Sequence, residues 1–343
     1  MKAIMKMKKN DPNLSYEMIE EPKIGEKEIL VKVHAAGICG SDIHILHEEY
    51  SSFPPVVLGH EYSGIVERVG SRVDRFKKGD RVVSMTAVET CGTCRYCMQG
   101  LKMLCPDRKS IGSGVNGAFA EYLKVPASLA FHIPANISMD EAALTEPLAC
   151  VVRGVLERST VKPGDYVYVS GPGIIGQFAV QLSALSGAYV VVAGIREDAE
   201  RLDLALEHGA SEKIIVDDED VLVRTQRITS SAGFDVAFEC SGNGSSSKTC
   251  VQILKKTGIY SQLGLYGRPI LFNMDLALTK ELVITNSYAS EWTSWEKALS
   301  LLSQGRLSLK PLVGEKFPFS RWREAFDKMI AKESYKILLE PNS

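Results

Sequence analysis

The chain has 343 residues, which is long for a single hydrophobic core and predicts two domains. Its 40 basic and 42 acidic residues nearly cancel, and without a Lys/Arg block the chain lacks the charge pattern of a nucleic-acid or acidic-membrane partner. This balance leaves a small-molecule ligand as the expectation. The N-terminus MKAIMKMKKN has no apolar h-region, so it is not typical of a signal peptide and predicts a cytoplasmic protein.

Up to about residue 135 the sequence consists of short alternating runs broken by Gly and Pro, which is typical of an all-β domain. These runs are EILVKVHAAG, YSGIVERVG, DRVVSM and AFAEYLKVP. Two polar stretches lie among them: GICGSDIH, which contains Cys39, and GHE, which contains His60 and Glu61.

Cys39, His60 and Glu61, with Glu146 further along, are the ligand types of an open catalytic zinc site, where water or substrate takes the remaining position. Each piece alone has a simpler explanation. An isolated Cys39 is more often a small buried apolar residue than a ligand, and an isolated Gly-His-Glu is more often a loop than a ligand set.

Four cysteines crowd into one short stretch. They are Cys91, Cys94, Cys97 and Cys105. Four thiolates from a single loop close a tetrahedral shell around zinc and leave no position for substrate. The spacing therefore predicts a structural zinc, and four reduced cysteines without metal are the alternative.

A change of pattern begins at Ser138, which forms a capping-box pair with Glu141 ahead of a helical run. A domain boundary near residue 150 follows. If Thr145 caps a new helix, Glu146 lies in its first turn, where the helix dipole favours a carboxylate and Pro147 is tolerated. Glu146 is then either a metal ligand or only a residue of this hinge helix.

The stretch from Tyr166 to Ile195 has no charged residue and is long enough to suggest a membrane span. Its glycines divide it instead into a strand at 166–169, a helix at 174–186 and a strand at 189–192. The turn between the first two elements is a G-x-G-x-x-G motif that predicts a dinucleotide site at a helix N-terminus. Its residues are Gly171, Gly173, Ile174, Ile175 and Gly176.

From residue 165 to 286 strand-like and helix-like runs alternate, which predicts a parallel sheet with helices on both faces. The segment from Ser287 onward carries a helix at 294–303 and does not extend this alternation. It is either a third unit or a return to the first.

Together these residues resemble the zinc-containing medium-chain dehydrogenase/reductase family, in its polyol and threonine dehydrogenase branch. The resemblance rests on GICGSDIH, GHEYSGIVERVG, KKGDRV, the four-cysteine loop, TEPLAC and VSGPGIIG, in the family's order. It implies an α/β plus β fold with a GroES-like catalytic domain at residues 1–150 and a doubly wound Rossmann domain at 151–286. The segment 287–343 would return to the catalytic domain.

By the same resemblance, Cys39 and His60 are ligands of the catalytic zinc, and Glu61 or Glu146 supplies the carboxylate. Which of the two binds directly stays open. Two zinc ions per chain are implied, one catalytic and one structural.

Three further residues take roles from the resemblance. Asp42 would orient the His60 ring, as a metal-bound imidazole requires, although an ordinary turn residue is the alternative. Ser41 would take the proton of the substrate alcohol, and His44 would pass it towards solvent.

A plain NAD site carries an acid at the tip of the second strand, about 20 residues past the first glycine. Here that strand runs into Gly194 and Arg196, which favours the 2′-phosphate of NADP. Alternatively Arg196 is a solvated loop charge, and Glu197 or Asp198 reaches the ribose.

The expected activity is reversible hydride transfer from the secondary alcohol of a sugar alcohol or sugar acid to NAD(P)+, giving a ketone. L-threonine 3-dehydrogenase, or a dehydrogenase of short-chain secondary alcohols, is the alternative within enzymes. A non-catalytic NAD(P)-binding sensor is the alternative from another class. A homodimer or homotetramer is implied by the resemblance alone.

Overall fold

The computed structural model describes residues 1–342 and divides the chain into two compact units. One unit contains residues 1–146 and the chain from residue 291 onward, and the other contains residues 147–290. Within the described residues no helix is both long enough and apolar enough to cross a membrane. The uncharged run from Tyr166 to Ile195 folds as strand, turn, helix and strand.

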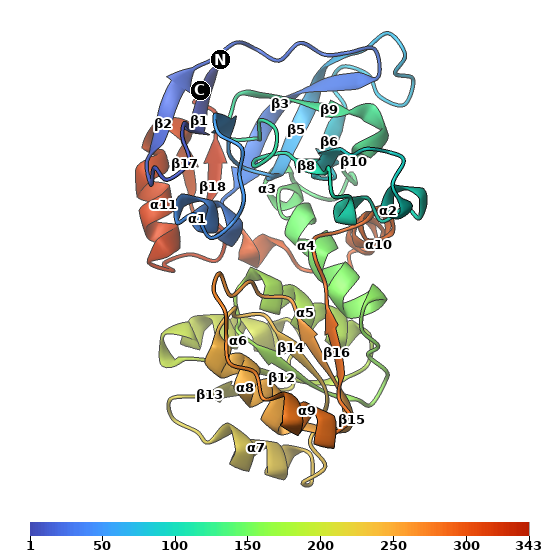
Figure 1. Cartoon of the computed structure of the whole chain (residues 1–343), viewed down its shortest axis with the longest axis vertical. Helices are drawn as coiled ribbons and strands as arrows, with labels where there is room; N and C mark the ends of the chain where they lie inside the picture. The colour runs from blue at the N-terminus through green and yellow to red at the C-terminus, as the bar shows by residue number, and fades with distance from the viewer. Residues whose placement is uncertain (343) are drawn as a thin grey trace. The chain divides into compact units, whose positions relative to one another are not determined.

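The first unit is built mainly of β-strands (Figure 1). Its strands are β1 (Lys2–Lys6), β2 (Leu14–Met18), β3 (Glu28–Gly37), β4 (Val56–Val57), β5 (Glu61–Val69), β6 (Arg81–Ser84), β7 (Ala87–Glu89), β8 (Lys109–Ser110), β9 (Tyr122–Pro126), β10 (Ala130–His132), β17 (Lys316–Pro318) and β18 (Leu338–Glu340). The largest sheet has the order β10-β6-β5-β3-β18-β17, and β9 also pairs with β3.

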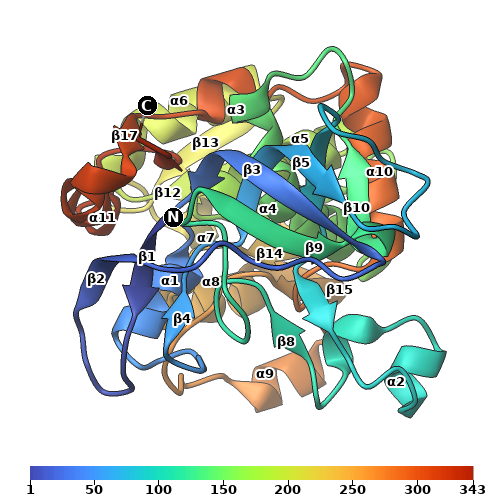
Figure 2. The ribbon, with the colours of Figure 1, turned by 90° about the horizontal axis from the view of Figure 1, so that it is seen from above.

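Strand β3 organises this sheet because it pairs with three others, and Figure 2 shows β9 and β5 beside it. Its apolar residues are buried in the core of the unit, as expected of a central strand. At its C-terminal end Gly37 stands opposite Glu61 of β5 on one side and Leu338 of β18 on the other. The C-terminal strands therefore belong to the sheet of the first unit.

Short helices surround this sheet. They are α1 (Gly40–Leu46), α2 (Arg95–Met98), α3 (Met139–Ala142), α10 (Trp292–Ser303) and α11 (Trp322–Ile330). The capping box predicted at the start of α3 is present: Ser138 Oγ accepts the N–H of Glu141 at 3.2 Å, and Glu141 Oε2 accepts the N–H of Ser138 at 3.0 Å.

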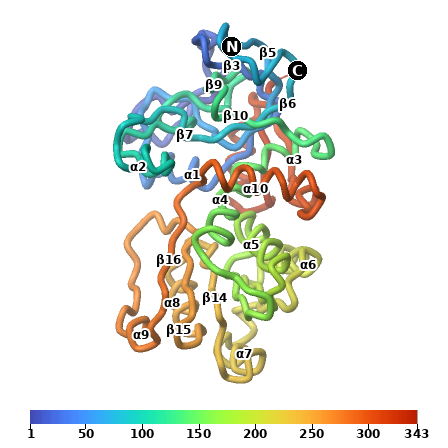
Figure 3. The backbone as a smooth tube through the Cα atoms, turned by 90° about the vertical axis from the view of Figure 1, so that its right-hand side faces the viewer, coloured from blue at the N-terminus to red at the C-terminus, as the bar shows by residue number. Residues whose placement is uncertain are grey.

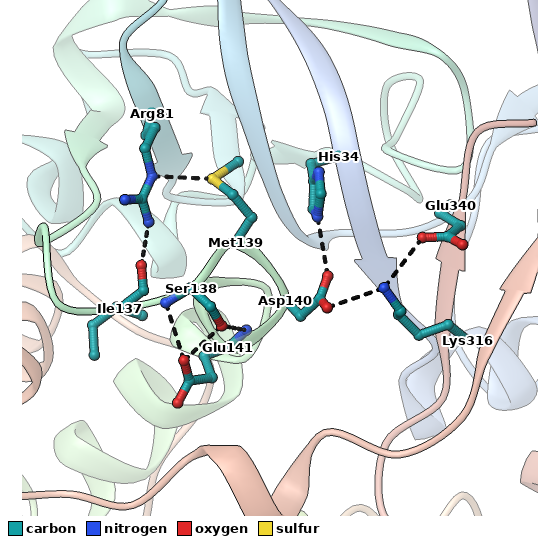
Figure 4. Close-up of polar contacts among 9 residues, drawn as sticks. All are labelled: His34, Arg81, Ile137, Ser138, Met139, Asp140, Glu141, Lys316 and Glu340. Atoms are coloured by element: carbon teal, nitrogen blue, oxygen red, sulfur yellow. Dashed lines mark hydrogen bonds and ion pairs between the residues drawn. The ribbon is translucent and has the colours of Figure 1, made fainter. Parts of the chain in front are cut away.

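Figure 4 shows how the same turn of α3 contacts the C-terminal strands. Asp140 Oδ1 lies 3.0 Å from Nε2 of His34 on β3, and its Oδ2 lies 3.1 Å from Nζ of Lys316 on β17. Lys316 also faces Glu340 of β18 at 3.6 Å. These half-exposed ion pairs link three parts of the first unit that are far apart in sequence, and each is worth little alone.

The second unit is a six-stranded sheet in which every pair of neighbours is parallel. Its strands are β11 (Tyr166–Ser170), β12 (Tyr189–Gly194), β13 (Glu212–Ile215), β14 (Phe234–Glu239), β15 (Leu254–Gln262) and β16 (Val283–Asn286). Its helices are α5 (Ile174–Leu185), α6 (Ala199–Glu207), α7 (Val221–Ile228), α8 (Gly244–Ile253) and α9 (Met274–Thr279). The order β13-β12-β11-β14-β15-β16 reverses direction between β11 and β14, as in a doubly wound dinucleotide-binding sheet. Figure 3 shows β15 and β16 side by side with α8 and α9 nearby.

Helix α8 ends at Ile253, because β15 begins at Leu254 and joins the parallel ladder with β14. One local expectation differs from the structure. The helix α4 (Thr145–Val152) begins at Thr145 itself, and the Thr145 hydroxyl has no hydrogen-bond partner, so Thr145 is not a side-chain cap. Glu146 lies in the first turn of α4 all the same.

Candidate functional site

The four-cysteine loop lies between β7 and β8, and its four sulfur atoms all lie within 4.8 Å of one another. Backbone N–H groups point at these sulfurs: Cys94 donates to Cys91 Sγ at 3.2 Å, and Cys97 donates to Cys94 Sγ at 3.5 Å. The N–H groups of Thr93 and Cys94 lower the pKa of Cys91 to about 6. Because zinc binds the thiolate, four convergent sulfurs, of which Cys91 is favoured in that form, fit a tetrahedral zinc.

A second cluster forms where two strands of the first unit meet. Cys39 follows β3, His60 precedes β5, and Glu61 is the first residue of β5. One ligand atom from each lies within 4.8 Å of the others. Strand pairing accounts for this, since Gly37 and Glu61 are partners in the β3-β5 ladder. A thiolate, an imidazole and a carboxylate leave one position of a tetrahedral zinc open, which suits a catalytic metal.

Asp42 supports this cluster from the first turn of α1. Its Oδ2 accepts the N–H of Cys39 at 2.9 Å, and its Oδ1 lies 3.8 Å from Nδ1 of His60. Burial raises the pKa of Asp42, although the nearby His60 and the Cys39 N–H act in the opposite direction. The carboxylate therefore faces the ring nitrogen that is not turned to Ser41.

His60 is the most strongly perturbed member of the cluster. Burial alone would lower the pKa of its imidazole, but Cys39, Asp42 and Glu146 together raise it well above the ordinary value. A metal must displace that proton to bind, so metal and proton compete for this ring. Glu146 contributes its charge here, but the group of three ligand atoms within 4.8 Å contains Glu61 and not Glu146.

Ser41 and His44 both lie on α1, one turn apart. Ser41 Oγ is 3.4 Å from Nε2 of His60, so the hydroxyl lies next to one of the candidate ligands. His44 Nδ1 lies 2.5 Å from Oε2 of Glu49, which follows α1. Glu49 lies outside the sequence motif that contains His44, so only the structure reveals their pairing.

Lys336 is a member of this site that the sequence reading missed. Its Nζ lies 2.6 Å from Oε2 of Glu61, and both side chains are only 1 % exposed. The same Nζ donates to the carbonyl of Ile38 at 3.0 Å. Burial would lower the pKa of Lys336, but Glu61 and Cys39 raise it, so the ammonium is the charged partner of Glu61.

In the second unit the predicted glycine turn connects β11 to α5, with Gly173 as the N-cap of the helix. A Cβ on Gly171, whose φ is +92°, would lie 2.9 Å from Cα of Ser241, and one on Gly176 would lie 1.8 Å from the carbonyl oxygen of Gly171. Only glycine fits such a turn. It leaves the free N–H groups of α5 available for a pyrophosphate.

A second loop lies against this turn and was not predicted. It follows β14, where the fully buried Glu239 accepts the N–H groups of Ser241 at 3.0 Å and Gly242 at 3.2 Å, and the hydroxyl of Ser246 at 3.0 Å. The loop therefore stands at the carboxyl ends of β11 and β14, where the strand order reverses and ligands bind in such sheets. The sequence feature that could have predicted this loop is Glu239, which ends a buried strand two residues before Ser241 and Gly242.

The tip of β12 is close to the glycine turn, because a Cβ on Gly194 would lie 2.9 Å from Cδ of Pro172. Arg196 follows it. Its backbone N–H donates to Asp217 Oδ2 at 2.7 Å, and its guanidinium pairs with Asp218. Asp198 Oδ1 faces Arg201 at 3.6 Å.

Two families of known proteins match the chain, one in its N-terminal part and one in its C-terminal part. Residues 25–135 match the family of alcohol dehydrogenase GroES-like domains, and residues 175–304 match the zinc-binding dehydrogenase family. The chain is 36 % identical to a sorbitol dehydrogenase of Halalkalibacterium halodurans, with 99 % of each chain covered. It is 35 % identical to an L-threonine 3-dehydrogenase of Bacillus licheniformis, again with 99 % of each chain covered.

Among solved structures, the chain is similar to a proposed zinc-binding dehydrogenase from Sinorhizobium meliloti bound to NADP. The two share 32 % identity and a TM-score of 0.90, with 99 % of each chain covered. The predicted fold class, a GroES-like domain with a Rossmann domain, is thereby confirmed. The chain is an enzyme that belongs to the zinc-containing medium-chain dehydrogenase/reductase family, in the branch of the polyol and threonine dehydrogenases.

Proposed function

We propose that the chain oxidises the secondary hydroxyl of a sugar alcohol or sugar acid to a ketone, with NAD(P)+ as the acceptor and two zinc ions per chain. The observation that carries this proposal is the convergence of Cys39, His60 and Glu61 beside Ser41 and Asp42. The first unit then holds the reacting alcohol, and the second unit holds the cofactor. The four-cysteine loop holds the structural zinc.

When bound, zinc supplies a Lewis acid for the substrate hydroxyl, and the nicotinamide supplies the hydride acceptor. The chain's own side chains remove the proton of the substrate hydroxyl. Ser41 relays it: Oγ, which lies 3.4 Å from the His60 ring, accepts the substrate's proton as its own hydroxyl proton leaves, and His44 passes that proton towards solvent. The exposed Glu49, 2.5 Å from His44, is the group that can receive it.

Glu61 is the better candidate for the direct carboxylate ligand. Its ligand atom lies with those of Cys39 and His60, and Lys336 holds it from the side of β18. Glu146 acts on the same site through its charge, from the first turn of α4.

A substrate panel of hexitols, aldonates, L-threonine and 2-butanol tests the proposed substrate class. We expect a hexitol or aldonate to have the highest kcat/KM, at least about tenfold above that of 2-butanol, because one well-placed hydrogen bond to a further hydroxyl is worth about that factor. The second candidate, L-threonine 3-dehydrogenase, is favoured by the similar enzyme of Bacillus licheniformis. A higher kcat/KM for L-threonine than for every polyol would replace the first candidate with the second.

For the cofactor we propose a preference for NADP. The support is Arg196 beside Gly194 at the tip of β12, where an NAD site carries an acid, and a similar protein that binds NADP. For the location of the protein we propose the cytoplasm, since all eight cysteines are free of disulfides and four of them form a metal loop.

We further propose that the chain is a homodimer or homotetramer, and that β16 takes part in the interface. In the described sheet β16 is an edge strand, with Val283 51 % and Ile284 41 % exposed. Such an apolar edge favours pairing with another chain.

Replacing Ile284 with Lys should shift the assembly towards a smaller species in light scattering coupled to gel filtration, because the charge would be buried between the two edges. Leu222→Lys on α7 is the matched control, since Leu222 is equally 41 % exposed. An unchanged mass for Ile284→Lys, or an equal loss for Leu222→Lys, would remove β16 from the interface.

A further inference from the structure

The loop after β13 brings two carboxylates to the place where the cofactor's ribose is expected. Strands β12 and β13 are parallel neighbours with Gly194 opposite Ile215, and the N–H of Val216 donates to the carbonyl of Gly194 at 3.0 Å. The next two residues of the chain, Asp217 and Asp218, therefore lie beside Arg196.

The two carboxylates contact Arg196 in different ways. Asp217 accepts the backbone N–H of Arg196 at 2.7 Å, which fixes the path of the loop. Asp218 pairs with the guanidinium, the group that would hold a 2′-phosphate. Arg196 is 67 % exposed and Asp218 44 % exposed along their side chains, so solvent and ligands can reach the pair.

Two neighbouring acids have other partners. Asp198 accepts the N–H of Ile195 at 3.4 Å and faces Arg201, while Asp220 caps α7 by accepting the N–H of Leu222 at 2.8 Å. Asp218 is thus the carboxylate that pairs with the Arg196 guanidinium.

A phosphate monoester carries nearly two negative charges at neutral pH, so it competes with Asp218 for the same cation. The 2′-hydroxyl of the NAD ribose is uncharged and does not compete. Arg196 can remain fully paired with Asp218 when NAD binds, whereas the 2′-phosphate of NADP competes with Asp218 for the guanidinium.

We propose that Asp218 is a specificity-determining residue for the cofactor: by holding the Arg196 guanidinium it opposes the 2′-phosphate and keeps the site open to NAD as well as NADP. This inference rests on the proposed NAD(P) site of the second unit. Asp218 acts through Arg196 and is a positioning residue, so its effect should vanish when Arg196 is absent.

Equilibrium binding of NADPH and NADH, followed by nucleotide fluorescence without alcohol, tests the proposal on the full-length protein. We expect Asp218→Asn to lower the Kd for NADPH roughly three- to fivefold, as the loss of one competing exposed charge pair allows, with little change for NADH. Arg196→Ala should raise the Kd for NADPH, and adding Asp218→Asn to it should change the Kd ratio by less than twofold.

Asp217→Asn is the matched control, since it removes the same charge one residue away but leaves the guanidinium pair in place. An equal shift in Asp217→Asn and Asp218→Asn would overturn the competition for Arg196, and so would additive effects of Asp218→Asn and Arg196→Ala. If the wild-type protein bound neither nucleotide, the proposed cofactor site itself would be wrong. If it bound both, and Asp218→Asn left the ratio of the two Kd values unchanged, only the proposed role of Asp218 would be wrong.

Discussion

Replacing Cys39 with Ser should reduce the zinc content from two ions per chain to one and lower kcat/KM by roughly a thousandfold or more. Cys39 contributes one of the three ligand atoms that lie within 4.8 Å in the first unit. A serine hydroxyl is a poor zinc ligand at neutral pH, and losing a Lewis acid removes several kcal/mol of transition-state stabilisation. Metal analysis and steady-state kinetics on the same preparation measure both effects.

The reciprocal variant is Cys97→Ser in the four-cysteine loop. It should also lose one zinc, but its main effect should be on stability, because a closed site contributes folding energy and has no position for substrate. Zinc content that stays at two in Cys39→Ser, or an active wild-type enzyme with a single zinc, would contradict the two-site assignment. Equal losses of kcat/KM in both variants at matched stability would contradict the division of roles.

Features that depend on neighbouring residues could be predicted from the sequence. Ser138 and Glu141 form the expected capping box, because both hydrogen bonds of that motif close within one turn. The glycines at 171 and 176 form the expected turn, because no side chain fits there. The motif series also identified the family and fold class, which the comparisons confirm.

Features that depend on which strands become neighbours could not be predicted in the same way. Lys336 reaches the carbonyl of Ile38, 298 residues away in sequence, because β18 pairs with the end of β3. Nothing in the local sequence of Lys336 distinguishes it from a surface lysine. The pairing of Arg196 with Asp218 likewise requires the β12-β13 register, although the two residues are close in sequence.

The choice between Glu61 and Glu146 shows the same limit. Both acids occur in motifs of the right type, and the sequence offers no measure of their distance from Cys39. Pairing of Gly37 with Glu61 across the β3-β5 ladder supplies that measure, since it brings the first residue of β5 next to the residues that follow β3. Strand pairing therefore indicates which acid lies near the residues that follow β3, whereas the sequence motif of each acid does not.

In protein without zinc at Glu61, replacing Lys336 with Met should lower the free energy of unfolding by about 3–5 kcal/mol, because it leaves the Glu61 carboxylate buried without a counter-charge. The pair is 2.6 Å long, and each side chain is only 1 % exposed. Thermal unfolding should show a melting temperature lower by roughly 10 °C. Added zinc should recover more of this loss than it adds to the wild type, since the cation offers Glu61 a new partner.

Lys6→Met is the matched control for Lys336→Met. Lys6 is also fully buried and pairs with Glu48 at 2.7 Å, but Glu48 is 33 % exposed and stays hydrated when its partner is lost. The control should therefore lose less stability. The double variant Glu61→Gln with Lys336→Met should recover much of the loss, because neither side chain then carries a buried charge. Equal destabilisation by Lys6→Met and Lys336→Met, or no recovery in the double variant, would show that Lys336 acts by packing rather than by holding the charge of Glu61.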